Sequence, residues 1–223
     1  MLRDDAMNVL LVNPNTNPDT TAMMVSIACK HAPRHWAITG RTLSQSALVI
    51  NTPPLLETAR HEMETLAGQG AFDGFDAVIV AAFGDPGLAA LRATLAVPVV
   101  GIGEAAIQAA MSRGQPYAIV SITPRLAQGT LQQVTRVGGD ALLRGVFYTA
   151  DNAAGERPLA DNIAMAANRA LDESNVSTLI IAGGPLASIA DRLLLQRDCH
   201  IVQPLPSAMR KLMSAAASHN KFQ

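Results

Sequence analysis

The segment VIVAAFGDPGL, residues 78–88, has the pattern of a buried strand followed by a tight turn and the start of a helix. The run from Val78 to Ala82 is apolar throughout, as expected for a parallel strand that is covered on both faces. The Gly-Asp-Pro-Gly turn then places proline at the first position of the next helix. In α/β proteins the carboxyl ends of parallel strands are where small molecules bind. We therefore expect a functional site here, although the residue at the end of the strand is Ala82.

The same order of elements continues along the whole chain, because short apolar runs alternate with segments of helical periodicity. We expect strands at residues 8–13, 36–43, 76–82, 97–102, 117–122, 141–148, 178–183 and 200–203. We expect helices near residues 19–32, 54–68, 87–95, 104–113, 124–137, 159–173, 186–196 and 206–218. Apolar strands separated by helices predict the α/β class, with doubly wound parallel sheets.

An internal repeat divides the chain into two halves. Residues 76–111 and residues 177–213 both show the order strand, Gly-Pro turn, helix, short strand, helix. Aligning the two segments pairs Ala82 with Gly183. We predict two pseudo-symmetric halves, residues 7–115 and 116–221, which form one two-lobed unit. The site is expected in the cleft between them, with Ala82 and Gly183 facing each other.

Proline follows a potential N-cap residue in strand-to-helix turns of both halves, at Asn17-Pro18, Asp85-Pro86, Thr123-Pro124 and Gly184-Pro185. Helix capping is one interpretation of Asn17, Asp85 and Thr123. The alternative is ligand binding, because four helix N-termini in equivalent places would direct backbone N–H donors into one cleft. Such a cleft would suit a carboxylate, an imide or a ring carbonyl.

The composition excludes several classes of function. The 223 residues are 49% hydrophobic and 16% charged, with 17 basic and 18 acidic residues and a net charge of −1. Such a balance gives no electrostatic footprint for nucleic acid or for a membrane surface. The chain has no signal-peptide pattern at its start and no apolar run long enough to span a membrane, so we expect a cytoplasmic protein. Cys29 and Cys199 show no metal-binding spacing and are expected to be structural.

The motifs LLVNPNTNPDTT (10–21), FGDPGLAALR (83–92), VVGIGEAAIQAA (99–110) and ASIADRL (187–193) strongly resemble the Asp/Glu/hydantoin racemase superfamily. Within it, the hydantoin and allantoin racemase branch is the most similar. The resemblance spans nearly the whole chain. It implies two α/β halves with the active site between them, no cofactor, and a homo-oligomer.

In that family two cysteines, one from each half, exchange the proton of the substrate α-carbon from opposite faces. The resemblance places the first cysteine at Ala82 and the second at Gly183, eight residues before Asp191, so both thiols are absent here. Loss of one general acid or base typically costs roughly 10²–10⁴ in rate. Two-thiol racemisation is therefore disfavoured, and Cys29 and Cys199 stand at neither position.

Several residues could still bind a carbonyl ligand or act on it. The side-chain amides of Asn13 and Asn15 suit the alternating N–H and C=O edge of a hydantoin, with stabilisation of the Asn-Pro-Asn turn as the alternative. The resemblance places a hydroxyl-bearing residue near the ligand carbonyl at Ser121, while Ile122 replaces a family threonine. The remaining candidates are Asp85 as the best-placed titratable group, the helix-cap residue Thr123, and the backbone near Phe83, Gly84 and Gly184.

The sequence thus predicts a cofactor-independent, racemase-like enzyme that acts beside a carbonyl of a small imide, ureide or amino-acid derivative. Its chemistry is expected to have diverged from two-thiol racemisation. Two alternatives stay open: a lyase, decarboxylase or hydrolase on a related substrate, and a non-catalytic binder of the same ligands. No pattern for a metal, a phosphate loop or a Ser-His-Asp triad is present.

Overall fold

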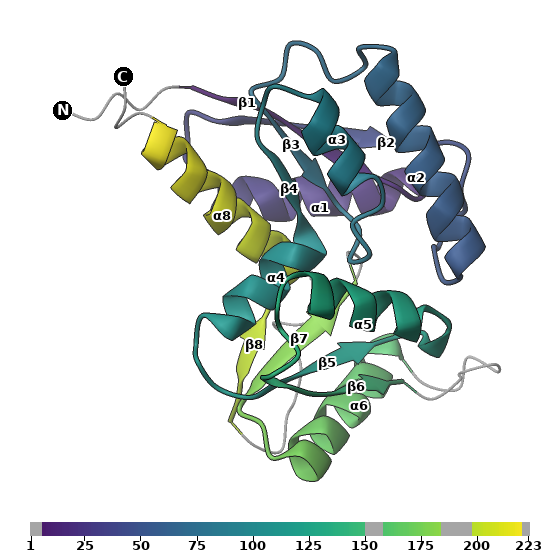
Figure 1. Cartoon of the computed structure of the whole chain (residues 1–223), viewed down its shortest axis with the longest axis vertical. Helices are drawn as coiled ribbons and strands as arrows, with labels where there is room; N and C mark the ends of the chain where they lie inside the picture. Colours follow the sequence, from purple (N-terminus) through teal and green to yellow (C-terminus); the bar gives the residue numbers. More distant parts are fainter. Residues whose placement is uncertain (1–5, 150–157, 184–197, 220–223) are drawn as a thin grey trace.

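The computed structural model describes residues 6–149, 158–183 and 198–219. Among these residues the strands form two four-stranded parallel sheets, one in each half of the chain (Figure 1). The first sheet has the strand order β2-β1-β3-β4, and the second has the order β6-β5-β7-β8. This arrangement confirms the α/β class, the parallel strands and the internal repeat.

The boundaries of the elements agree with the expected ones to within a few residues. The first half contains β1 (Asn8–Asn13), α1 (Pro18–His31), β2 (Ala37–Thr42), α2 (Pro53–Gly68), β3 (Ala77–Val80), α3 (Leu88–Thr94), β4 (Val99–Gly101) and α4 (Ile102–Met111). The second half contains β5 (Tyr117–Ser121), the 3-10 helix η1 (Pro124–Leu126), α5 (Ala127–Arg136), β6 (Leu143–Tyr148), α6 (Leu159–Ser174), β7 (Thr178–Ala182), β8 (His200–Val202) and α8 (Pro204–His219). The helix expected at 186–196 lies outside the described residues.

The two positions expected for thiols follow the central strands of the two sheets. β3 lies between β1 and β4, and β7 lies between β5 and β8, so the two strands hold equivalent places. Ala82 comes two residues after the end of β3, and Gly183 comes directly after β7. β3 is shorter than expected because its ladder ends at Ala81, whose N–H donates to the carbonyl oxygen of Val12 at 2.8 Å.

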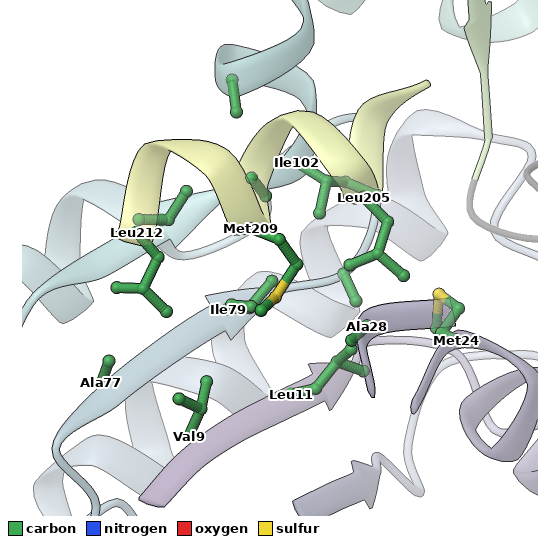
Figure 2. Close-up of a cluster of buried hydrophobic side chains, with 14 residues drawn as sticks. Val9, Leu11, Met24, Ala28, Ala77, Ile79, Ile102, Leu205, Met209 and Leu212 are labelled. Carbon is green, nitrogen blue, oxygen red and sulfur yellow. The ribbon is translucent and has the colours of Figure 1, made fainter. Parts of the chain in front are cut away.

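One face of the first sheet is covered by α1 together with α8, the last helix of the chain (Figure 2). Leu205 and Met209 of α8 pack against Val9, Leu11 and Ile79 of the sheet, and all five side chains are buried. Burial of one large aliphatic side chain contributes roughly 1.5–3 kcal/mol. The end of the chain is therefore held on the half that contains its beginning.

The helix α4 has the equivalent position in the first half and also contacts both halves. Its residues Ile102 and Ala105 join the cluster under α8, while Ile107 and Ala110 pack on the second sheet. The last helix of each half therefore helps to cover the sheet of the other half. The division of the chain between residues 115 and 116 stays a prediction, because α4 and α8 each pack against the sheet of the other half.

The opposite face of each sheet is covered by helices of its own half. α2 and α3 cover the second face of the first sheet, α5 joins α4 on the second sheet, and α6 covers its far face. No helix within the described ranges is long and apolar enough to cross a membrane.

Candidate functional site

The turn from Ala82 to Leu88 differs from the expected one, because Pro86 lies in the turn and is not the first residue of the next helix. Asp85 has a φ of 46° and Gly87 a φ of 76°, both in the left-handed region. The helix α3 begins at Leu88 with Gly87 as its N-cap residue, so the interpretation of Asp85 as a cap of its own helix is wrong. The Asp85 side chain instead points away from α3.

Asp85 caps a different helix. Its Oδ1 accepts a hydrogen bond from the backbone N–H of Gly103 at 3.0 Å, and its Oδ2 accepts one from the N–H of Glu104 at 2.7 Å. Both donors belong to the first turn of α4, where backbone N–H groups lack partners within the helix. The Nε2 of Gln133, on α5, donates to the same Oδ2 at 2.6 Å. The carboxyl group therefore joins the turn to two helices that pack on the second sheet.

The glycines of the GIGEA motif make this contact possible. A Cβ at Gly101 would lie under 3.0 Å from the carboxyl atoms of Asp85, closer than real Cβ atoms come. A Cβ at Gly103 would likewise overlap the carbonyl oxygen of Phe83 and the amide of Gln133. The motif is thus required by the close approach of the 82–87 turn to the start of α4.

Burial raises the pKa of Asp85 to about 7, because the three donors offset only part of the cost of desolvation. The side chain is 5% exposed. The Oε1 of Gln133 is buried without a hydrogen-bond partner, and rotation of this amide would present it to a protonated Asp85. The geometry gives Asp85 a structural role. Its role as a catalytic base stays a prediction that none of these contacts favours.

The amide of Asn13 is used within the Asn-Pro-Asn turn. Its Nδ2 lies within hydrogen-bond distance of Asn15 Oδ1 (2.7 Å), Thr21 Oγ1 (2.9 Å) and the Asn17 carbonyl oxygen (3.1 Å). Its Oδ1 accepts from the N–H of Asn15, whose own Oδ1 accepts from the N–H of Asn17. Asn17 in turn caps α1, as expected. These contacts favour turn stabilisation, and binding by Asn13 and Asn15 stays a prediction.

The loop after β5 carries a more available polar group. Ser121 is half-buried, and its hydroxyl makes no hydrogen bond with the residues described. Ile122 packs against the apolar cluster under α6. Thr123 caps η1 by accepting from the N–H of Arg125 at 3.3 Å, and its hydroxyl donates to the Asn51 carbonyl oxygen at 3.3 Å. Of these three residues, Ser121 keeps the side chain best suited to contact a ligand.

The expected thiol positions carry no acid or base. Ala82 and Phe83 are half-buried and Gly84 is exposed. Gly183 has a φ of 146°, a conformation that residues with a side chain rarely adopt. Gly184 lies outside the described residues. The placement of the backbone donors near Phe83, Gly84 and Gly184 around a ligand therefore stays a prediction.

Gln133 is a polar residue of this region that gave no readable signal in the sequence. Gln133 lies 48 positions after its partner Asp85, so only the fold brings them together. Glu104 lies in the first turn of α4, where the carboxyl group of Asp85 accepts hydrogen bonds from the backbone N–H groups. The carboxyl group of Glu104 pairs with Arg92 of α3 and Lys211 of α8. Burial alone would raise the pKa of Glu104, but these two cations outweigh it and hold the pKa at about 2.

The two cysteines lie apart from these contacts. Cys29 is exposed on α1. Cys199 packs against the cluster under α6, and burial together with Asp198 raises its thiol pKa. Within the described part of the chain, no group of three His, Cys, Asp or Glu side chains is placed to hold a metal ion.

Comparison with known proteins gives consistent matches over almost the whole chain. Residues 9–212 match the family model described as Asp/Glu/Hydantoin racemase. A hydantoin racemase from Rhizobium meliloti is 28% identical over 220 residues, which cover 92% of this chain and 86% of that protein.

Two solved structures share the fold. The allantoin racemase from Klebsiella pneumoniae superposes with a TM-score of 0.85 at 21% identity, over 96% of this chain and 89% of that one. The allantoin racemase from Pseudomonas fluorescens gives a TM-score of 0.85 at 24% identity, over 96% and 92% of the two chains.

Proposed function

The chain belongs to the Asp/Glu/hydantoin racemase family, and from this premise we propose that it is a cofactor-independent, racemase-like enzyme. Its substrate class is a small imide, ureide or amino-acid derivative with an acidic C–H beside a carbonyl. The similarity to a hydantoin racemase and to the folds of two allantoin racemases supports this class. The chemistry has diverged from two-thiol racemisation.

The observation that carries the divergence is the pair of residues at the thiol positions. Ala82 and Gly183 follow equivalent strands, and neither side chain can carry a proton. Racemisation needs a proton acceptor on one face of the α-carbon and a donor on the other. Ligand contacts are proposed to come from the Ser121 hydroxyl and from backbone N–H groups of the 82–87 turn, which would polarise the carbonyl.

Hydrogen exchange at the α-carbon tests this proposal. The native protein is incubated with 5-substituted hydantoins in D₂O, and the α-hydrogen is followed by proton NMR. We expect exchange at the background rate, since nothing at Ala82 or Gly183 removes the proton. Fast exchange by the native protein would show that another residue acts as the base.

The variant Ala82→Cys should gain exchange without racemisation. A thiolate there takes the α-proton, exchanges it with solvent, and returns a deuteron to the same face. The double variant Ala82→Cys, Gly183→Cys should also racemise, although the φ of Gly183 opposes a side chain. The single variant therefore remains informative where the double variant fails to fold. No gain in a folded Ala82→Cys variant that binds the hydantoin would contradict the assignment of the site.

The surviving thiols serve as the matched control. Replacing Cys29 and Cys199 with serine should leave binding and exchange unchanged, because Cys29 is exposed and Cys199 packs under α6. Lost exchange in this control, measured in the Ala82→Cys background, would indicate an unexpected thiol mechanism.

The protein is further proposed to act in the cytoplasm as a homo-oligomer. The family membership supports this proposal. Light scattering of the purified protein would test the oligomer, and a single species of 23.4 kDa would contradict it.

A further inference from the structure

A cavity of about 820 Å³ opens between the two halves, beside the turn that carries Asp85. One wall comes from α2 and from residues 84–92, and the other from residues 125–137 of η1 and α5. Figure 1 shows α5 at the edge of the second half nearest to α2 and α3. The volume of the cavity is typical of small-molecule pockets. The described residues that line it include Gly84, Asp85 and Gly87 but not Ala82, Asn13 or Ser121, so the cavity lies beside the candidate active site and shares the 82–87 turn with it.

The wall formed by η1 and α5 presents a row of hydrogen-bond donors, which we name the α5 stripe: Arg125, Gln128, Gln132 and Arg136. The last three are four residues apart, which places them along one face of α5, and Arg125 precedes them in η1. Within the described part of the chain, none of the four side chains makes a hydrogen bond or an ion pair. The stripe therefore has unused donors directed along one side of the cavity.

The opposite wall carries charges of both signs, and most of them are paired with one another. Arg60 pairs with Glu57 and Glu64. Arg92 pairs with Glu104, which also binds a lysine of α8. Asp85 also lines this wall, and its carboxyl group is bound by two backbone N–H groups and by Gln133. Residues 125–137 carry no acidic side chain, so the unpaired charge on the wall formed by η1 and α5 is positive.

We propose that this cavity binds a small organic anion with two carboxylate or phosphate groups. Arg125 and Arg136 hold the two anionic groups, because a guanidinium group binds both chemistries through paired N–H donors. Gln128 and Gln132 contact the polar middle of the ligand. The two arginines are eleven positions apart along η1 and α5, which places their Cα atoms at most roughly 17 Å apart at about 2.0 Å per residue in η1 and 1.5 Å in α5. The ligand is therefore extended, with its charges near its ends.

Isothermal titration calorimetry of the full-length protein tests the site with defined probes. Suberate is an extended dicarboxylate, malonate a compact one, and fructose 1,6-bisphosphate carries a phosphate at each end. We expect suberate or the bisphosphate to bind at least tenfold more tightly than malonate. Binding should weaken as sodium chloride is raised, because the contacts are charged. The arm that binds more tightly identifies carboxylate or phosphate as the natural group.

The double variant Arg125→Gln, Arg136→Gln should weaken this binding at least tenfold while its melting temperature stays near that of the wild type. Arg34→Gln is the matched control, because Arg34 is exposed and lies outside the cavity. Equal weakening in the control, equal affinity in the double variant, or no binding of either extended anion at millimolar concentration would overturn the proposal. The test uses no hydantoin and so is independent of the proposed function.

Discussion

Replacing Gly103 with alanine should strongly destabilise the fold. The new Cβ would overlap the carbonyl oxygen of Phe83, which is backbone and cannot rotate away. The turn must then move off the start of α4. That movement breaks the hydrogen bonds that the N–H groups of Gly103 and Glu104 donate to the Asp85 carboxyl group.

The magnitude follows from those contacts. A hydrogen bond to a charged group contributes roughly 1.5–3 kcal/mol, so loss of two costs about 3–6 kcal/mol. For a domain of this size, 1 kcal/mol corresponds to roughly 2–4 °C in melting temperature. We expect Gly103→Ala to melt roughly 6–24 °C below the wild type by circular dichroism, and its unfolding free energy in urea to fall by about 3–6 kcal/mol.

Gly129→Ala is the matched control for Gly103→Ala. Gly129 lies in α5, and a Cβ there would meet nothing within 4 Å. Glycine within a helix is less favourable than alanine by roughly 0.5–1 kcal/mol, so this variant should be slightly more stable than the wild type. A Gly103→Ala variant within about 1 kcal/mol of the wild type would refute the reasoning, since the turn would then not depend on the close approach.

Three further perturbations test the surrounding contacts. Burial raises the pKa of Asp85 to about 7, above its unfolded value of about 3.9, so its stabilisation is present at low pH and is lost as the pH rises through 7. The difference in unfolding free energy between wild type and Asp85→Asn should therefore shrink from about pH 5 to about pH 8 in urea titrations, and a constant difference would contradict this pKa. The pKa of Glu104 is lowered to about 2, so its stabilisation is present above its unfolded pKa and is lost as the pH falls. Glu104→Gln should cost roughly 1–3 kcal/mol at neutral pH, and a gap that fails to close toward pH 2 would argue against the ion pairs with Arg92 and Lys211. Met209→Ala leaves a cavity between α8 and the first sheet and should cost roughly 2–5 kcal/mol, whereas a loss below about 1 kcal/mol would show that α8 does not hold the first half.

Much of the fold could be predicted from local pattern. The apolar runs predicted the strands because parallel strands are buried on both faces, and the two copies of one pattern predicted two similar sheets. Asn17 before Pro18 was a correct helix cap, because capping depends on residues only two and three positions away. The family motifs predicted the racemase fold, and with it the places of Ala82 and Gly183.

The contacts of the candidate site were less predictable. Asp85 was expected to cap the helix that follows it, yet it caps α4, 18 and 19 residues further along the chain. Asn13 has the side chain of a ligand-binding residue, but its amide is used by the turn in which it lies. Gln133 was not identified, because no local pattern marks a residue of α5 whose partner, Asp85, lies 48 positions earlier in a turn of the first half.

By itself, the sequence determined the alternation of strands and helices, the repeat, and the presence of alanine and glycine at the two positions where the family resemblance predicts thiols. These properties are local, because each depends on residues a few positions apart or on the identity of one side chain. Only the tertiary structure decided that α4 and α8 pack across the two halves, that Asp85 joins the turn to α4 and α5, and that α5 presents unpaired arginines to a cavity. Such contacts join residues far apart in the chain. They are fixed by which apolar faces pack together and by which buried polar groups find partners there.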